Sequence, residues 1–237
     1  MATNKSQHIS QQFEKELQDI RTQVMAMGGI VEKQVQNAME ALMHADTELA
    51  REVISGDDAV NKIEIAIDEE CIQIIALRQP TASDLRLVTG ILRSITDLER
   101  IGDESVRIAR MALNLSEKDR PKKNYRELIS MGQHVQGMLH NALDSFARLD
   151  VDAALAVAHE DTEIDAEYES ILRQLVTYMM EDPRTVSRAV DMMWSARSLE
   201  RIGDHSRNIA EHIIYLVEGK DVRHISLEKM EKVVKGD

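Results

Sequence analysis

A six-residue phrase, LERIGD, occurs twice in the chain and carries two acids at a spacing that suits metal binding. The first copy holds Glu99 and Asp103, and the second holds Glu200 and Asp204. Residues four apart lie on one face of a helix, and here that face continues an apolar stripe. Burying paired carboxylates without compensation is costly. We therefore expect positive charge beside each phrase.

Long amphipathic helices must position these acids. Apolar residues recur every three or four positions and predict one helix up to about residue 43, a second over 47–77 and a third over 85–115. The second ends at RQPTASD, because a proline disfavours helical geometry in the residue before it. SEKDRPKKN, over 116–124, is charged and aperiodic and reads as a linker. The inner face of the second helix is expected to comprise Val53, Val60, Ile63, Ile67, Ile74 and Leu77.

After the linker the pattern starts again, which indicates a tandem duplication. Met27 and Gly28 recur 104 residues later as Met131 and Gly132, and segments 94–109 and 195–210 share ten identities in sixteen positions. With 10 glycines, 3 prolines and 3% aromatic residues, the composition favours helix throughout. We expect an all-α fold, a tandem repeat of two antiparallel three-helix bundles with six long helices. The expected domains are residues 1–117 and 118–237.

Antiparallel packing predicts which residues face the repeated phrase. Glu99 and Asp103 lie 19 and 23 residues after Pro80, and counting the same numbers of residues back from Pro80 reaches Asn61 and Asp57. Glu64 lies about one helical turn closer to Pro80. The same count about Pro183 reaches Thr162 and Ala166, which are flanked by Asp161 and Asp165. Such clusters of oxygen ligands suit magnesium, calcium, manganese or iron rather than structural zinc. Because Asn61 is neutral, we expect the first site to bind metal more weakly.

Another interpretation of the acids needs no metal. Arg100 and Arg201 follow the two glutamates directly, and further arginines lie on the same helices: Arg86, Arg93, Arg107 and Arg207. An arginine–carboxylate network would neutralise the acids on its own. The histidines show no spacing typical of a ligand set and are interpreted as surface or core polar residues. Cys71 stands among isoleucines and is expected to be a core thiol.

The remaining composition limits the function classes. A net charge of −13 weighs against nucleic-acid binding. We find no signal peptide and no apolar run near the roughly 18 residues that span a bilayer, so a cytoplasmic location is expected. No nucleophile–base arrangement or glycine-rich phosphate loop is present. A metal-dependent hydrolase using the carboxylate clusters, and a purely structural bundle, stay open as alternatives.

The doubled LERIGD phrase, with QPTASDLRLV before the first copy and YMMEDPRT before the second, closely resembles the PhoU family of phosphate-signalling regulators. RTQVMAMGG and AIDEECIQIIA extend the resemblance over essentially the whole chain. The family implies two similar three-helix bundles whose E/D-x-x-x-D motifs hold metal ions, in some relatives as iron or zinc clusters. Seven residues match this pattern, and Asn61 departs from it: Asp57, Glu99, Asp103, Asp161, Asp165, Glu200 and Asp204.

The resemblance also implies a role. PhoU proteins are non-enzymatic adaptors between the ATPase subunit of a phosphate ABC transporter and a phosphate-responsive sensor histidine kinase. They keep the phosphate-starvation regulon off and restrain phosphate uptake when phosphate is plentiful. A homodimer is implied, acting peripherally at the inner membrane through its partners. The implied cofactors are divalent or trivalent ions of Mg, Mn, Fe or Zn.

Overall fold

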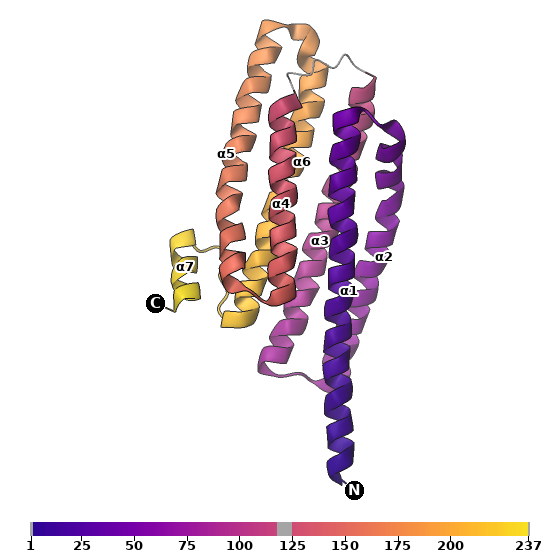
Figure 1. The fold of residues 1–237 in the computed structure, drawn as a ribbon, viewed down its shortest axis with the longest axis vertical. Helices are drawn as coiled ribbons and strands as arrows, with labels where there is room; N and C mark the ends of the chain where they lie inside the picture. The colour runs from indigo at the N-terminus through magenta and orange to yellow at the C-terminus, as the bar shows by residue number, and fades with distance from the viewer. Residues whose placement is uncertain (1, 118–124, 237) are drawn as a thin grey trace.

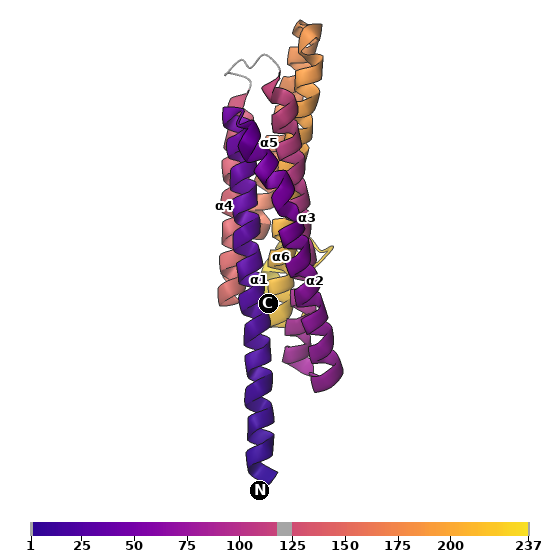
Figure 2. The same cartoon turned by 90° about the vertical axis from the view of Figure 1, so that its right-hand side faces the viewer.

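Six long helices form two three-helix bundles in the computed structural model, which describes residues 2–117 and 125–236. Neighbouring helices in each bundle run antiparallel, and the N-terminal end of α1 extends past the others (Figures 1 and 2). The expected linker over 116–124 falls largely outside the described residues. The first bundle comprises α1 (Ala2–His44), α2 (Thr47–Arg78) and α3 (Ala82–Ser116), and the second comprises α4 (Arg126–Arg148), α5 (Val151–Glu181) and α6 (Val186–Glu218).

The turn between the first two helices of each bundle is made in the same way. The carboxylate of Asp46 accepts hydrogen bonds from the backbone N–H groups at the start of α2, at 3.1 and 3.0 Å. Asp150, 104 residues later, accepts one from Ala153 at the start of α5, at 3.0 Å. An aspartate at this position satisfies N–H groups that the helix itself leaves unpaired. The duplication therefore extends to the caps.

The apolar stripes form the core as expected. Ile20, Val24, Met27 and Val31 of α1 are at most 1% exposed, and the buried residues of both bundles belong to one continuous core. The prediction for Leu77 was wrong, since it is 76% exposed. It lies in the last turn of α2, next to the break at Pro80, where the helix face is no longer covered.

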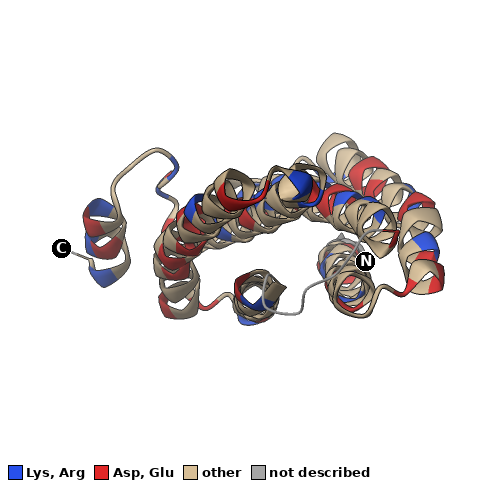
Figure 3. Ribbon diagram, turned by 90° about the horizontal axis from the view of Figure 1, so that it is seen from above, with Lys and Arg blue, Asp and Glu red and all other residues tan. Residues whose placement is uncertain are grey.

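Helices α3 and α6 share the most extensive helix–helix contact and join the two bundles. A short helix that the sequence did not predict, α7 (Leu227–Lys235), packs on the outer side of α5, where His159 Nε2 lies 3.0 Å from Glu231 Oε1. Figure 3 shows α7 at the edge of the second bundle. A 3₁₀ turn, η2 (Pro183–Thr185), precedes α6. None of the helices in the described ranges is long and apolar enough to span a membrane.

Candidate metal centres

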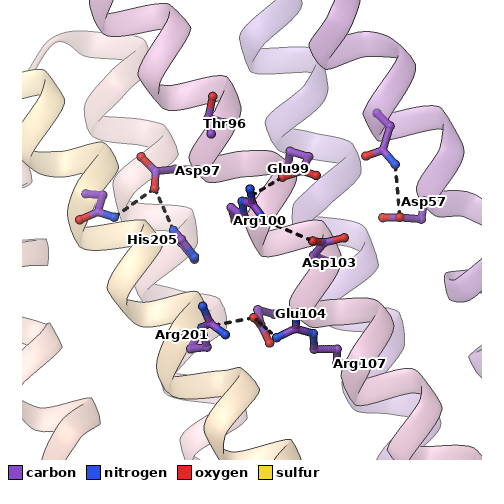
Figure 4. Close-up of polar contacts among 12 residues, drawn as sticks. Asp57, Thr96, Asp97, Glu99, Arg100, Asp103, Glu104, Arg107, Arg201 and His205 are labelled. Atoms are coloured by element: carbon purple, nitrogen blue, oxygen red, sulfur yellow. Dashed lines mark hydrogen bonds and ion pairs between the residues drawn. The ribbon is translucent and has the colours of Figure 1, made fainter.

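The structure brings the acids of the first phrase together with the residues predicted to face them. Glu99 and Asp103 lie on α3, and Asp57 faces them from α2 (Figure 4). Burial raises the pKa of Asp57, and the charge of Asp103 raises it further. Burial likewise raises the pKa of Glu99, with Asp103 and Glu64 adding to the rise. These mutual effects place the four carboxylates in one electrostatic neighbourhood.

Amide groups complete the first cluster. Asn61 Nδ2 lies 3.5 Å from Asp57 Oδ2, while Asp57 Oδ1 and Asn61 Oδ1 are buried and find no hydrogen-bond partner among the described residues. Gln34 of α1, which the sequence did not single out, is 7% exposed, and both atoms of its amide are equally unpartnered there. A Cβ on Gly102 would lie 3.3 Å from Gln34 Oε1 and 3.5 Å from Asp57 Oδ1. Glycine at this position in the phrase therefore lets the polar groups approach α3.

The second cluster repeats the arrangement with more charge. Asp161 is 3% exposed and Glu200 is 8% exposed. Burial, and next the charge of Asp204, raises the pKa of Glu200 to about 7. Burial is also the main cause that raises the pKa of Asp165 and of Asp204, and the charge of Asp161 is the next largest cause for both. All four acids predicted for this site therefore converge between α5 and α6.

Arginines neutralise part of this charge, as the interpretation without metal expected, but not the same arginines in both repeats. Arg100 lies 3.4 Å from Glu99 and 3.8 Å from Asp103. Its counterpart Arg201 contacts Glu104 of α3 at 3.4 Å instead of the acids of its own repeat (Figure 4). In the second cluster Arg197 pairs with Glu200, and Arg207 pairs with Asp161 at 2.8 Å.

The donor set suits a hard cation. Every charged ligand candidate is a carboxylate, and the unpartnered atoms of the first cluster, together with Glu200 Oε2, include the oxygen acceptors that such an ion binds. No group of three or more Asp, Glu, His or Cys side chains within the described ranges is arranged to hold a metal ion as it stands. Coordination would require the carboxylates to turn toward a common point. Metal binding thus stays a prediction that the chemistry of the residues fits.

Comparison with known proteins identifies the family. The model of the PhoU domain matches the chain twice, over residues 24–112 and 128–213. The chain belongs to the PhoU family. The resemblance carried by the LERIGD phrases is thereby confirmed, and each match contains one copy of the phrase.

Relatives match the chain over nearly its whole length. A protein of Pseudomonas aeruginosa, named phosphate-specific transport system accessory protein PhoU homolog, is 55% identical over 97% of this chain and 95% of its own length. PhoU of Escherichia coli K12 is 50% identical over 98% and 96%. The crystal structure of PhoU from Pseudomonas aeruginosa has a TM-score of 0.86 at 54% identity, covering 88% of this chain and all of that one. PhoU from Streptococcus pneumoniae reaches 0.83 at 31% identity, covering 89% and 99%.

A further polar cluster, separate from the two carboxylate clusters, lies between α3 and α6 of this PhoU-family chain and was not predicted from the sequence. Asp97 of α3 is buried and accepts hydrogen bonds from three side chains of α6: His205 at 2.8 Å, His212 at 2.9 Å and Asn208 at 3.0 Å. Carboxylate oxygens can only accept, so both imidazoles donate. The expectation that these histidines are surface or core polar residues holds for their burial but overlooked their shared partner. Their spacing of seven, two turns along one helix face, was the available signal.

Proposed function

We propose that this chain is a metal-binding, non-enzymatic accessory protein of phosphate-specific transport and a negative regulator of the phosphate-starvation regulon and of phosphate uptake. The observation that carries the proposal is the similarity to proteins named phosphate-specific transport system accessory protein PhoU, which extends over at least 97% of the chain at 50–55% identity. At this identity and coverage the relatives are expected to share the architecture of this chain.

The proposed mode of action is that of an adaptor in the cytoplasm. Its partners would be the ATPase subunit of the phosphate ABC transporter and the phosphate-responsive sensor histidine kinase, and its working form a homodimer. Two bundles with a common core suit this role, because a rigid scaffold can present separate faces to separate partners. Exposed apolar side chains on α6, Trp194 at 60% and Val190 at 40%, are available for such contacts.

A complementation experiment tests the regulatory role. In a strain that lacks its own PhoU-family gene and carries a phosphate-starvation reporter, this chain should switch the reporter off in high phosphate. Pull-down with the transporter ATPase and with the kinase, and light scattering of the purified chain, test the adaptor and the dimer. A soluble chain that leaves the reporter fully on would overturn the proposed regulation.

The metal part of the proposal has its own test. Elemental analysis of the purified chain, and of the double variants Glu99→Gln/Asp103→Asn and Glu200→Gln/Asp204→Asn, should show metal lost from one cluster at a time. Chelation should lower the thermal stability of the unsubstituted chain and change that of the fourfold variant much less. Equal metal content in all of these proteins would refute binding at the clusters.

The proposal assigns no catalysis to the chain, and no contact among the described residues specifically favours the hydrolase alternative. A phosphatase assay on protein loaded with Mn²⁺, Mg²⁺ or Zn²⁺ decides the matter. Turnover that Asp103→Ala abolishes would support the enzyme, whereas binding of the transporter ATPase without turnover would support the adaptor.

A further inference from the structure

The two carboxylate clusters differ at the positions that flank their common phrase. Residues of the third helix in each repeat correspond at a spacing of 101, so Glu99 matches Glu200 and Asp103 matches Asp204. At the same spacing Val106 stands where the second repeat has Arg207, and Thr96 stands where it has Arg197. The second cluster thus has two arginines at positions that are uncharged in the first.

Arg207 sits inside the second cluster. Its Nη1 donates to Asp161 Oδ2 at 2.8 Å and its Nε donates to Glu211 Oε1 at 3.1 Å. Asp161 is 3% exposed and Glu211 is 5% exposed, while the arginine side chain itself is 29% exposed. A guanidinium that bridges two buried carboxylates supplies the charge that would otherwise be missing.

The first cluster shows the same acid without this cation. Asp57 corresponds to Asp161, but Val106 offers no hydrogen bond, and Asp57 Oδ1 stays buried with no partner within the described residues. Gln34 is more than nine-tenths buried, and its amide likewise has no partner within the described residues. Gln34 Oε1 and Asp57 Oδ1 lie on the same side of Gly102, since a Cβ there would be 3.3 Å from the first and 3.5 Å from the second. Arg100 pairs with Glu99 and Asp103 in the first cluster, and Arg110 lowers the pKa of Asp57 through its charge, but no cation of the described residues forms an ion pair with Asp57 itself. In the second cluster Arg207 forms that ion pair with the corresponding acid, Asp161.

We propose that Arg207 is a resident counter-ion of the second cluster, which must release Asp161 when a metal ion binds there and which lowers the affinity of that cluster for metal. The inference rests on the proposed metal binding. It opposes the order of affinities that Asn61 alone would produce. A metal ion and the guanidinium would compete for the carboxylate of Asp161, because Arg207 already holds its Oδ2 oxygen.

The surroundings allow the release. Arg207 lines a pocket of about 420 Å³ together with Asp204, so the cluster and the open space share a wall. Glu211 binds Nε rather than Nη1, and this second contact keeps the arginine anchored while the terminal nitrogen leaves Asp161. The released guanidinium would then remain paired, which limits the cost of displacement.

The test measures binding of Mn²⁺ alone by isothermal titration calorimetry in the Glu99→Gln/Asp103→Asn background, where only the second cluster is intact. Arg207→Val installs the residue of the first repeat, and Arg207→Gln serves as a second neutral variant that retains hydrogen bonding. Both should bind Mn²⁺ about tenfold more tightly or better, which is the factor that a charge-assisted hydrogen bond is worth. Arg207→Lys, which keeps the charge, should stay close to the parent. Arg173→Gln, at an exposed arginine of α5 paired with Glu169, is the matched control and should change nothing.

The outcomes separate this inference from the function on which it rests. If the parent binds Mn²⁺ and both neutral variants bind with unchanged or lower affinity, Arg207 is a structural or organising residue and the inference is overturned. If no member of the series, nor the unsubstituted chain, binds any of the candidate metals, the proposed metal binding itself fails. Thermal melts give a readout independent of calorimetry: without metal the neutral variants should be less stable than the parent, and Mn²⁺ should raise their Tm by more. An equal metal-induced shift would also count against the inference.

Discussion

At the scale of single residues, the two glutamates of the repeated phrase show how packing changes the chemistry of an identical motif. Glu99 lies beside carboxylates and amides and near an exposed arginine, whereas Glu200 is 8% exposed between α5 and α6 and crowded by aspartates. Burial first and Asp204 second raise the pKa of Glu200 to about 7. Its charged form is therefore disfavoured in the metal-free fold, although Arg197 pairs with it.

This shift predicts a pH dependence of stability. The pKa of Glu200 in the folded state, about 7, lies above the ordinary value of 4.5. Its contribution to stability is fully present below pH 4.5 and is lost as pH rises through 7. In metal-free protein Glu200→Gln should therefore raise the free energy of unfolding at pH 8 by ~1 kcal/mol or more, and by much less at pH 5. Urea titrations at the two pH values check this, with the exposed Glu163→Gln as control; a gain independent of pH would contradict it.

Gln34 is the second residue whose surroundings predict an effect. Both polar atoms of its amide are buried, with no hydrogen-bond partner in the described ranges, and the second repeat has Met138 at the corresponding position, 104 residues later. A buried amide without partners costs free energy that a thioether of similar length avoids. Gln34→Met should stabilise the metal-free protein by about 1–2 kcal/mol in chemical denaturation. The exposed Gln36→Met should stay within about 0.5 kcal/mol. A loss of stability in Gln34→Met would show that the amide is bonded in solution.

At the scale of elements, Asp97 fastens α3 to α6. Burial alone would raise its pKa, but the hydrogen bonds from His205, His212 and Asn208 outweigh burial and lower it. An acid whose pKa is lowered contributes stability above its ordinary value of 3.8, and this contribution is lost as pH falls through the lowered value. At neutral pH this ionised carboxylate therefore adds to the stability of the contact between the two bundles.

Removing that carboxylate leaves three donors of α6 without an acceptor. We expect Asp97→Ala to destabilise the protein by roughly 3–5 kcal/mol at pH 7, since one member of a buried, hydrogen-bonded set is removed. Ser198→Ala, at the corresponding buried position of the second repeat, is the matched control and should cost about 1 kcal/mol or less. Thermal and urea unfolding measure both. Similar losses in the two variants would refute a special role for Asp97.

The sequence predicted the helices better than the contacts between them. Apolar periodicity, the turn at Pro80 and the tandem duplication predicted the six long helices. Counting about Pro80 and Pro183 placed Asp57 opposite the first phrase, and Asp161 one residue from the position opposite the second. The partners of those acids could not be read in this way. Arg207 reaches Asp161 across 46 positions of sequence, and His205 reaches Asp97 across 108. Such pairings depend on the rotation and spacing of packed helices, which a periodic pattern does not specify.

At the scale of the whole molecule, the duplication also shapes how the bundles meet. Helices α1 and α4 contact each other through two reciprocal pairs. A Cβ on Gly28 of α1 would lie 2.5 Å from Leu143 of α4, and a Cβ on Gly132 of α4 would meet Met39 of α1. Gly28 corresponds to Gly132, and Met39 to Leu143, each at a spacing of 104. The absence of a side chain at Gly28 thus makes room for Leu143 of the other bundle.

This reciprocal contact predicts which glycine substitutions disturb the packing of the two bundles against each other and lower the stability of the protein. Gly28→Val should force α1 away from Leu143 and lower the free energy of unfolding by about 1–3 kcal/mol. Gly29→Val is the matched control, because nothing lies within 4 Å of a Cβ there while the change in helix propensity is the same. Gly132→Val should behave like Gly28→Val, and Gly137→Val, whose Cβ would also meet nothing within 4 Å, like Gly29→Val. Because both bundles share one core, each destabilised variant should still unfold in a single transition by circular dichroism. Two separate transitions would show instead that the bundles fold independently.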